Sequence, residues 1–300
     1  MWRDLKYLVE YFLVRLAVNI FSLLPWRALP SISRVFGFLA PWFMPARARL
    51  VVDNINFALP ERGKRDCQKM AQVFWRNISL TMLESFKANS FGVQKIKDCS
   101  VLENEEVFRD ALEQKKGVLL HTGHFGNWEL AGDAITVSGY PLCVLGRKQR
   151  NPYVDRWLYH LRTRFGAKIL DHHQAVRETQ QWLKSNGCLG ILMDHNLYKG
   201  GIFVDFFGKP AATTTLTALL HLRLGSPIVG VYSYRKNGKH YVRFEKINTE
   251  MDRAAAALDR NAQAKILTET LTRKIEDWVR EDPANWLWGH NRWKRQPEIY

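Results

Sequence analysis

One short passage of the sequence combines residue types that suit acid–base catalysis. His124 and Glu129 lie five residues apart in the run His121-Thr-Gly-His-Phe-Gly-Asn-Trp-Glu129. A histidine can take a proton from a hydroxyl group near neutral pH, and a carboxylate can fix its tautomer and stabilise the imidazolium. The pattern predicts that His124 acts as a general base and that Glu129 orients it.

The same spacing occurs a second time, so the local structure has to distinguish the two copies. His240 and Glu245 fall in a predicted strand, where residues five apart point to opposite faces of the sheet. His124 instead lies where a strand gives way to a helix at Gly126, so the chain can fold back and bring Glu129 to the ring. Only the first copy is expected to form a pair.

Short apolar runs alternate with amphipathic stretches beyond residue 116. Predicted strands cover residues 117–121, 141–145, 167–170, 188–193, 227–234 and 241–247, the last two joined across Lys236-Asn-Gly-Lys239. Predicted helices cover residues 63–90, 151–165, 175–186, 213–224 and 254–279, and another begins within 126–132. The alternation predicts an α/β fold with a central, mostly parallel or mixed sheet flanked by helices. Ligands then bind at the carboxyl ends of the strands.

The first fifty residues are predicted to associate with a membrane. The apolar stretch 5–24 is interrupted by Glu10 and Arg15 near its middle, which suits an interfacial helix better than a spanning one. Seven Arg and Lys in residues 1–50 favour contact with anionic lipids of a cytoplasmic leaflet. No signal-peptide cleavage site follows. We therefore expect a membrane-associating helical segment over 1–49 and one domain over 50–300, although two core helices of a soluble domain are the alternative.

The composition limits the classes of partner. The 300 residues contain 44 Arg and Lys against 29 Asp and Glu, a net charge of +15, which favours polyanions: nucleic acid, anionic lipid or an acidic carrier protein. No nucleic-acid-binding motif is present, so nucleic acid is not expected. Four isolated cysteines indicate no disulfide framework and a reducing, cytoplasm-facing location. His121 and His124 lack a third ligand at metal-site spacing, so no metal is expected; His172 and His173 are expected at the surface.

Residues 124–129, His-Phe-Gly-Asn-Trp-Glu, resemble the first signature of the lysophospholipid acyltransferase superfamily. More narrowly, they resemble the bacterial lipid A late acyltransferases of lauroyl and myristoyl type, and relatives that acylate mannosylated inositol lipids. Further blocks follow in the order of that family: residues 147–152, Asp194 with residues 206–215, residues 227–231, and the Trp-rich ending 286–295. Gly289 and Asn291 depart from the family's ending. The resemblance covers nearly the whole chain.

The resemblance implies an acyltransferase domain over 50–300 that moves a fatty acyl chain from a thioester to a lipid hydroxyl, without cofactor or metal. The expected donor is an acyl carrier protein and the expected acceptor a glycolipid, most of all a lipid A precursor, at the cytoplasmic face of the inner membrane. His124 and Glu129 would be catalytic. The substrate contacts would be Arg147, Arg150, Asn127, Asp194, Gly208 and Thr213.

Several alternatives stay open from the sequence. The acceptor could be lysophosphatidic acid or another membrane glycolipid, the donor could be coenzyme A, and a non-catalytic basic protein that binds membrane or nucleic acid would share the charge. Asp194 suits a cleft and a helix cap equally well, and residues 213–215 suit a helix N-terminus. The basic run at 147–168 suits ligand binding or a solvated face. The ending 286–295 suits internal packing or the bilayer.

Overall fold

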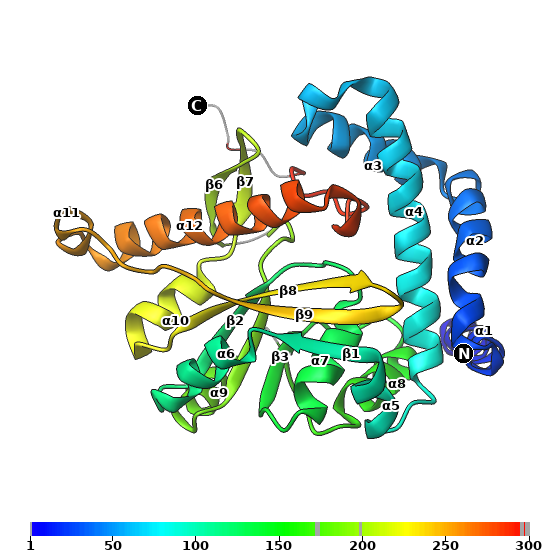
Figure 1. The fold of residues 1–300 in the computed structure, drawn as a ribbon, viewed down its shortest axis with the longest axis horizontal. Coiled ribbons are helices and arrows are strands. Elements are labelled where there is room, and N and C mark those ends of the chain that lie inside the picture. The colour runs from blue at the N-terminus through cyan, green and yellow to red at the C-terminus, as the bar shows by residue number, and fades with distance from the viewer. Residues whose placement is uncertain (1, 172–174, 198–199, 295–296, 298–300) are drawn as a thin grey trace.

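The chain folds around one twisted sheet with helices on both faces (Figure 1). The computed structural model describes residues 2–171, 175–197, 200–294 and 297; His172, His173 and Arg295 lie outside these ranges. Seven strands form the main sheet in the order β1-β9-β8-β2-β5-β3-β4, and β6 and β7 form a separate hairpin. The main-sheet strands are β1 (Ser100–Glu103), β2 (Val118–Thr122), β3 (Leu142–Gly146), β4 (Lys168–Asp171), β5 (Cys188–Leu192), β8 (Ile228–Lys236) and β9 (Lys239–Lys246).

Helices occupy most of the remaining chain. The three at the N-terminus are α1 (Trp2–Leu23), α2 (Leu29–Phe43) and α3 (Pro45–Ala58). Those after them are α4 (Gly63–Ala88), α5 (Val93–Cys99), α6 (Glu105–Glu113), α7 (Trp128–Val137), α8 (Pro152–Thr163), α9 (Ala175–Lys184), α10 (Leu216–Leu224), α11 (Arg253–Ala256) and α12 (Arg260–Glu281). The small hairpin joins β6 (Ile202–Phe206) to β7 (Lys209–Thr213).

The central strands are apolar on both sides because both faces of the sheet are covered. Leu119 of β2 packs in the cluster that includes α10 and α12, whereas Val118 and Leu120 pack in the cluster that includes α5, α6 and α7. Successive residues of a strand point to opposite faces, so an unbroken apolar run fits a buried parallel strand. The α/β fold class expected from the sequence is confirmed.

The strand arrangement brings two polar residues to one point at the edge of the sheet. Strands β2 and β5 are parallel neighbours, and their last residues, Thr122 and Leu192, are partners in the register. His124 and Asp194 each follow two residues later. Because the carboxyl ends of parallel strands meet at one edge, the two side chains must lie near each other.

The elements predicted from the sequence are present with small shifts, apart from three differences. Residues 213–224 begin as the end of β7, and the helix α10 starts only at Leu216. The stretch 254–279 is divided into α11 and α12, because Asp259 caps a new helix through the N–H groups of Asn261 and Ala262. The sequence pattern did not predict α3, nor β1, α5, α6 and the β6–β7 hairpin; apart from α3, these elements are short. The turn at Asn237-Gly238 has positive φ at both residues, as a two-residue hairpin requires.

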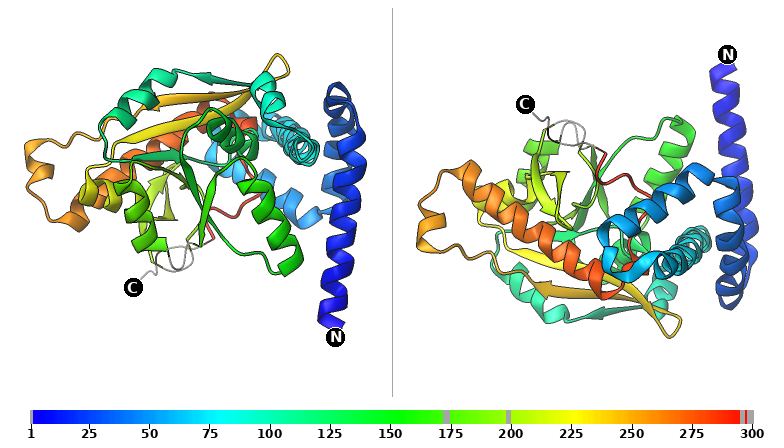
Figure 2. Two further views of the ribbon diagram at one scale, coloured as in Figure 1. Left: turned by 90° about the horizontal axis from the view of Figure 1, so that it is seen from below. Right: turned by 90° about the horizontal axis from the view of Figure 1, so that it is seen from above.

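The N-terminal helices pack against α4 along one side of the molecule, and the N-terminal part of α1 extends beyond the rest (Figure 2). Helix α2 approaches α4 closely at Gly37, where a Cβ atom would lie 2.6 Å from the Cα of Arg76. The boundary expected between residues 49 and 50 falls inside α3. Within the described residues, no single helix is both long and apolar enough to cross a membrane. The two helical stretches 2–23 and 26–43 reach the required length and hydropathy only when they are taken as a pair. The chain bends by 103° between them.

His121 ties the sheet to α12, and its environment predicts a pH-dependent stability. The ring is fully buried, and its Nε2–H donates to the carbonyl of Leu271 at 2.9 Å. Burial lowers the pKa of His121 to about 4, from an ordinary value near 6.5. The unfolded chain therefore binds more protons between these values, so this contribution to stability is complete above pH 6.5 and is lost as the pH falls toward 4.

We expect the free energy of unfolding of the wild type to fall by roughly 3 kcal/mol between pH 6.5 and pH 4 on account of this group. His121→Gln should lack that part of the slope in urea unfolding, because the amide does not titrate. The exposed His160, replaced by Gln, is the control and should keep the wild-type slope. Parallel slopes for wild type and His121→Gln would contradict the assignment.

Candidate active site

His124 is joined to Asp194 by two hydrogen bonds. The Nδ1 atom of the ring lies 2.8 Å from Asp194 Oδ1, and the backbone N–H of His124 donates to Oδ2 at 2.7 Å. Both residues lie just beyond neighbouring strands, so the register of β2 and β5 fixes their separation. The carboxylate holds the histidine at its backbone and at its ring, which leaves the imidazole little freedom to rotate.

A third N–H group reaches the same carboxylate from the C-terminal segment. Trp286 donates its indole Nε1–H to Asp194 Oδ2 at 2.8 Å, and both residues are almost completely buried. Burial by itself would raise the pKa of Asp194, but the adjacent His124 and its hydrogen bonds hold that pKa well below its ordinary value. Asp194 is therefore an ionised, buried carboxylate.

The charge on Asp194 determines the tautomer of His124. An ionised carboxylate can only accept hydrogen bonds, so Nδ1 must carry the proton and donate it. In the neutral ring the lone pair then lies on Nε2, the atom that can take a proton from a substrate. The side chain of His124 is 15% exposed, and it borders a small hollow together with Thr81, Trp128 and Arg235.

Glu129 is paired with a different residue from the one predicted. Arg162 of α8 donates Nε–H to Glu129 Oε2 at 2.9 Å, and its Nη2 donates to Oε1. This bidentate pair links the first turn of α7 to α8. The structure therefore corrects the expected contact between His124 and Glu129: the carboxylate that binds the ring is Asp194, and Glu129 binds a guanidinium.

The turn between His124 and α7 is built from buried backbone. Gly126 has a φ of +54°, and a Cβ atom there would lie 2.7 Å from the carbonyl oxygen of Ser233. Asn127 is 1% exposed and caps α7 by accepting from the N–H of Leu130 at 3.1 Å, while its Nδ2 donates to Glu84 at 3.1 Å. Asn127 thus holds the turn in place, and its side chain is not open to the substrate contact expected from the sequence.

His195 stacks on His124, and His290 in turn stacks on His195. The ring of His195 lies parallel to that of His124, with centroids 4.1 Å apart and 5° between the planes, and His290 stacks on its other face, also at 4.1 Å. The ligand atoms of His124, Asp194 and His195 lie within 4.8 Å of one another, which is the spacing of a metal site. However, an imidazole lone pair lies in the plane of its ring, so two parallel stacked rings cannot both point at an ion about 2 Å from each nitrogen. The parallel stacking of His124 and His195 therefore does not suit coordination of one ion by both rings.

The comparison with known proteins identifies the family. The model of the bacterial lipid A biosynthesis acyltransferases matches residues 2–295. The chain belongs to this family. It is 26% identical to the lipid A biosynthesis lauroyltransferase of Escherichia coli over 96% of this chain and 94% of the relative, and 23% identical to the lipid A biosynthesis palmitoleoyltransferase of the same species over 91% and 87%. The chain is also 20% identical to a phosphatidylinositol mannoside acyltransferase of Mycolicibacterium smegmatis, over 61% of this chain and 59% of that relative.

The basic run of this acyltransferase is divided between internal pairs and exposed cations. Arg162 binds Glu129, and Arg164 binds Asp133 at 2.6 Å. Arg147 and Arg150 lie exposed in the loop between β3 and α8, at the same edge of the sheet as His124. Neither forms an ion pair with another described residue, so both stay open to an anionic ligand.

The third block supports the scaffold of the acyltransferase. Gly208 lies in the exposed turn of the β6–β7 hairpin with a φ of +74°. Thr213 is fully buried at the end of β7, where its Oγ1 accepts from the guanidinium of Arg292 at 2.5 Å. Thr213 therefore does not begin a helix, and its hydroxyl is not accessible to a substrate in this arrangement.

The Trp-rich ending packs inside the protein. Trp286, Trp288 and Trp293 are all buried, and residues 285–287 run beside residues 124–126, with Gly126 N–H donating to Asn285 O and Leu287 N–H to His124 O, each at 3.1 Å. The contact of Trp286 with Asp194 has no signature in the sequence. The position of Asp194 does have one, since it follows a buried strand by the same two residues as His124.

We expect Trp286→Phe to lower the free energy of unfolding by about 2 kcal/mol, because a charged, buried acceptor loses one donor. Trp288→Phe is the matched control. It also removes a buried indole N–H, but that group donates to the neutral carbonyl of Pro283, so we expect a loss of about 1 kcal/mol. Urea unfolding of the two variants measures the difference; equal losses would argue against a special role for the bond to Asp194.

Proposed function

We propose that this acyltransferase moves a fatty acyl chain from an acyl thioester to a hydroxyl group of a lipid A precursor, with His124 as the general base and Asp194 as the residue that orients it. The main support is the pair of hydrogen bonds between His124 and Asp194, which directs the basic Nε2 away from the carboxylate. Family membership and relatives named for lipid A biosynthesis support the reaction and the acceptor.

In the proposed reaction, His124 Nε2 takes the proton of the acceptor hydroxyl as its oxygen attacks the thioester carbonyl carbon. The ionised Asp194 stabilises the imidazolium that forms. The tetrahedral intermediate then collapses, the carbon–sulfur bond breaks, and the leaving thiolate takes the proton from Nε2. The products are an ester and a free thiol, and the histidine returns to its starting state.

We propose an acyl carrier protein as the donor. Its support is the two exposed arginines Arg147 and Arg150, which form no ion pair with another described residue and lie at the edge of the sheet that carries His124. An acidic carrier would be attracted by this field, and the fork geometry of arginine suits the phosphate of its prosthetic arm.

We further propose that residues 2–44 hold the enzyme on the cytoplasmic face of the inner membrane, in contact with anionic lipids. Sixteen of the 22 exposed large apolar side chains of the described residues lie in this segment. In α1, Val18 is the one described residue that is buried, so most of the apolar surface of the helix faces outward. Apolar surface of this extent, flanked by basic residues, is typical of interfacial helices.

We expect His124→Ala to reduce acyl transfer at least about 1000-fold, and Asp194→Asn about 100-fold or more, because the variant amide can no longer hold the tautomer with Nε2 basic. The assay follows ester formation by mass spectrometry with acyl carrier protein or coenzyme A thioesters and with a lipid A precursor or lysophosphatidic acid. Transfer from the carrier protein to the lipid A precursor should be fastest. Full activity of Asp194→Asn would overturn the proposed role of Asp194.

Variants of the ion pair between Glu129 and Arg162 test whether Glu129 acts on His124 directly or through Arg162. If Glu129 acts through Arg162, Glu129→Gln and Arg162→Met should reduce activity by similar factors, and the double variant should lose little more. A loss for Glu129→Gln as large as that of His124→Ala, with Arg162→Met still active, would show that Glu129 acts on the histidine directly.

The membrane proposal predicts the effect of charges on the exposed apolar surface. Phe12→Glu combined with Trp42→Glu should weaken binding to anionic vesicles about 100-fold, because two exposed aromatic anchors become charged. Val93→Glu combined with Leu258→Glu, which are exposed elsewhere, is the control for the added charge and should leave binding close to the wild type. Vesicle flotation measures both, and equal weakening would contradict the assignment of the surface.

A further inference from the structure

A second, larger cavity lies next to the hollow that His124 borders. It has a volume of about 610 Å³, is open to solvent on one side, and is bordered by residues 26–27, α2, α4, the β8–β9 hairpin and the turn after α12. Asn77, Arg235, Ala284 and Asn285 line both spaces, so the cavity and the hollow adjoin along α4. Its size is within the usual range of small-molecule sites.

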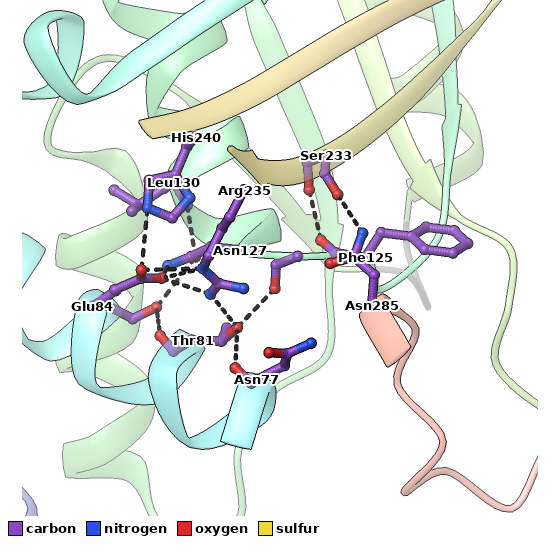
Figure 3. Close-up of polar contacts among 12 residues, drawn as sticks. Asn77, Thr81, Glu84, Phe125, Asn127, Leu130, Ser233, Arg235, His240 and Asn285 are labelled. Carbon is purple, nitrogen blue, oxygen red and sulfur yellow. Dashed lines mark hydrogen bonds and ion pairs between the residues drawn. The ribbon is translucent and has the colours of Figure 1, made fainter. Parts of the chain in front are cut away.

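Glu84, Arg235 and His240 line the cavity and belong to a polar network that joins α4 to the hairpin (Figure 3). Arg235 donates to Glu84 through Nε at 3.0 Å and through Nη2 at 2.6 Å, and Nη2 also donates to Thr81 at 2.6 Å. His240 lies 3.4 Å from the same carboxylate. Burial by itself would raise the pKa of Glu84, but Arg235 and His240 hold it at about 2, so Glu84 is ionised. Nη1 of Arg235 has no hydrogen bond to another described residue.

The walls of the cavity carry an excess of positive charge. Six Arg and Lys line it against two carboxylates, Glu84 and Asp282. Glu84 is already matched by Arg235, whereas the other five cations are exposed and form no ion pair within the part of the chain that the structure describes: Arg27, Arg34, Arg76, Lys236 and Lys239. Several uncompensated cations around one concave space attract an anionic ligand, and arginine in particular binds phosphate.

The position of the cavity favours a ligand that comes from the membrane. Arg34 and Ser33 of α2 form part of its wall, and the same helix exposes Phe38 and Trp42, which belong to the proposed membrane surface. A lipid anchored beside α2 would bring its headgroup to this opening. The exposed Arg147 and Arg150 belong to a different element, the loop after β3, so the cavity does not coincide with the basic site proposed for the carrier protein.

We propose that this cavity binds a phosphate group on the sugar headgroup of the acceptor lipid and so places its hydroxyl group beside His124. The inference rests on the proposed function and deepens it by assigning the acceptor subsite. Arg34, Arg76 and Lys239 supply the charge, and the Glu84–Arg235 network holds α4 and the β8–β9 hairpin together along the cavity wall.

The test compares variants of two exposed cavity cations with a matched pair elsewhere. Arg34→Gln combined with Arg76→Gln should raise the KM for a phosphorylated acceptor in detergent micelles about tenfold or more, with kcat and the KM for the donor within about twofold of the wild type. Arg49→Gln combined with Arg65→Gln removes the same charge from exposed positions outside the cavity and should change neither KM.

An acceptor without its phosphate provides the decisive second arm. The wild type should show a raised KM for this acceptor, and the cavity variant should raise it no further, because the contact is already absent. If the cavity variant raised the KM for the acceptor without phosphate by the same factor as for the phosphorylated one, the phosphate would bind elsewhere. A rise confined to the KM for the donor would assign the cavity to the phosphodiester of the prosthetic arm, and unchanged constants would overturn the proposal altogether.

Binding without turnover separates this inference from the proposed reaction. The His124→Ala protein should bind a phosphorylated disaccharide that lacks acyl chains, and Arg34→Gln with Arg76→Gln in that background should weaken binding about tenfold. If the wild type transfers no acyl chain but this binding difference holds, the cavity assignment stands and the reaction assignment fails. Equal binding with and without the two arginines would contradict the site. Competition by inorganic phosphate alone, as strong as by the disaccharide, would show that the site does not recognise the sugar headgroup.

Discussion

The buried carboxylate of Asp194 is the interaction on which the candidate site depends. Among the described residues, three N–H groups donate to it: two belong to His124, 70 residues earlier in the sequence, and one belongs to Trp286, 92 residues later. A buried charge is costly unless its hydrogen bonds are satisfied, so the loop after β2 and the C-terminal segment must both be in place for Asp194 to stay ionised. The orientation of the histidine and the packing of the ending are therefore two results of the same constraint.

The rest of the fold supplies the geometry that this constraint requires. Parallel pairing of β2 with β5 places His124 and Asp194 at one edge of the sheet, and the turn at Gly126 keeps the histidine loop close to Ser233 of β8. Residues 285–287 then run against the same loop. Helix α3 holds the following residues, since Asn54 donates to the carbonyl groups of Trp288 and His290 at 2.8 and 2.9 Å. The helices before the sheet and the residues after it thus meet at the site.

The sequence predicted the succession of most strands along the chain and the position of His124 between a strand and a helix, but not the partner of the histidine. Five-residue spacing describes a possible local contact, whereas the actual contact depends on which strands are neighbours, and no local pattern reports that β2 lies beside β5. Arg162 of α8 competes for Glu129, which spacing within one motif cannot foresee. The buried ending was ambiguous for a similar reason, because an indole suits both a core and a bilayer, and only the position of its N–H partner distinguishes them. Short elements such as β1 and the β6–β7 hairpin carry too few residues for their periodicity to stand out.

The polar residues inside α1 have a consequence for how the enzyme meets its substrate. Asn151, at the start of α8, donates to the carbonyl of Tyr7 at 2.8 Å and to Glu10 at 3.1 Å, so the amphipathic first helix is fastened to the body of the protein. With α1 lying at the lipid surface as proposed, this attachment sets the height of His124 above the bilayer and prevents the body from tilting freely. The enzyme would then select acceptor hydroxyl groups by their depth within the headgroup layer. A hydroxyl group that lies too deep cannot reach the imidazole, even if the rest of the lipid is bound well.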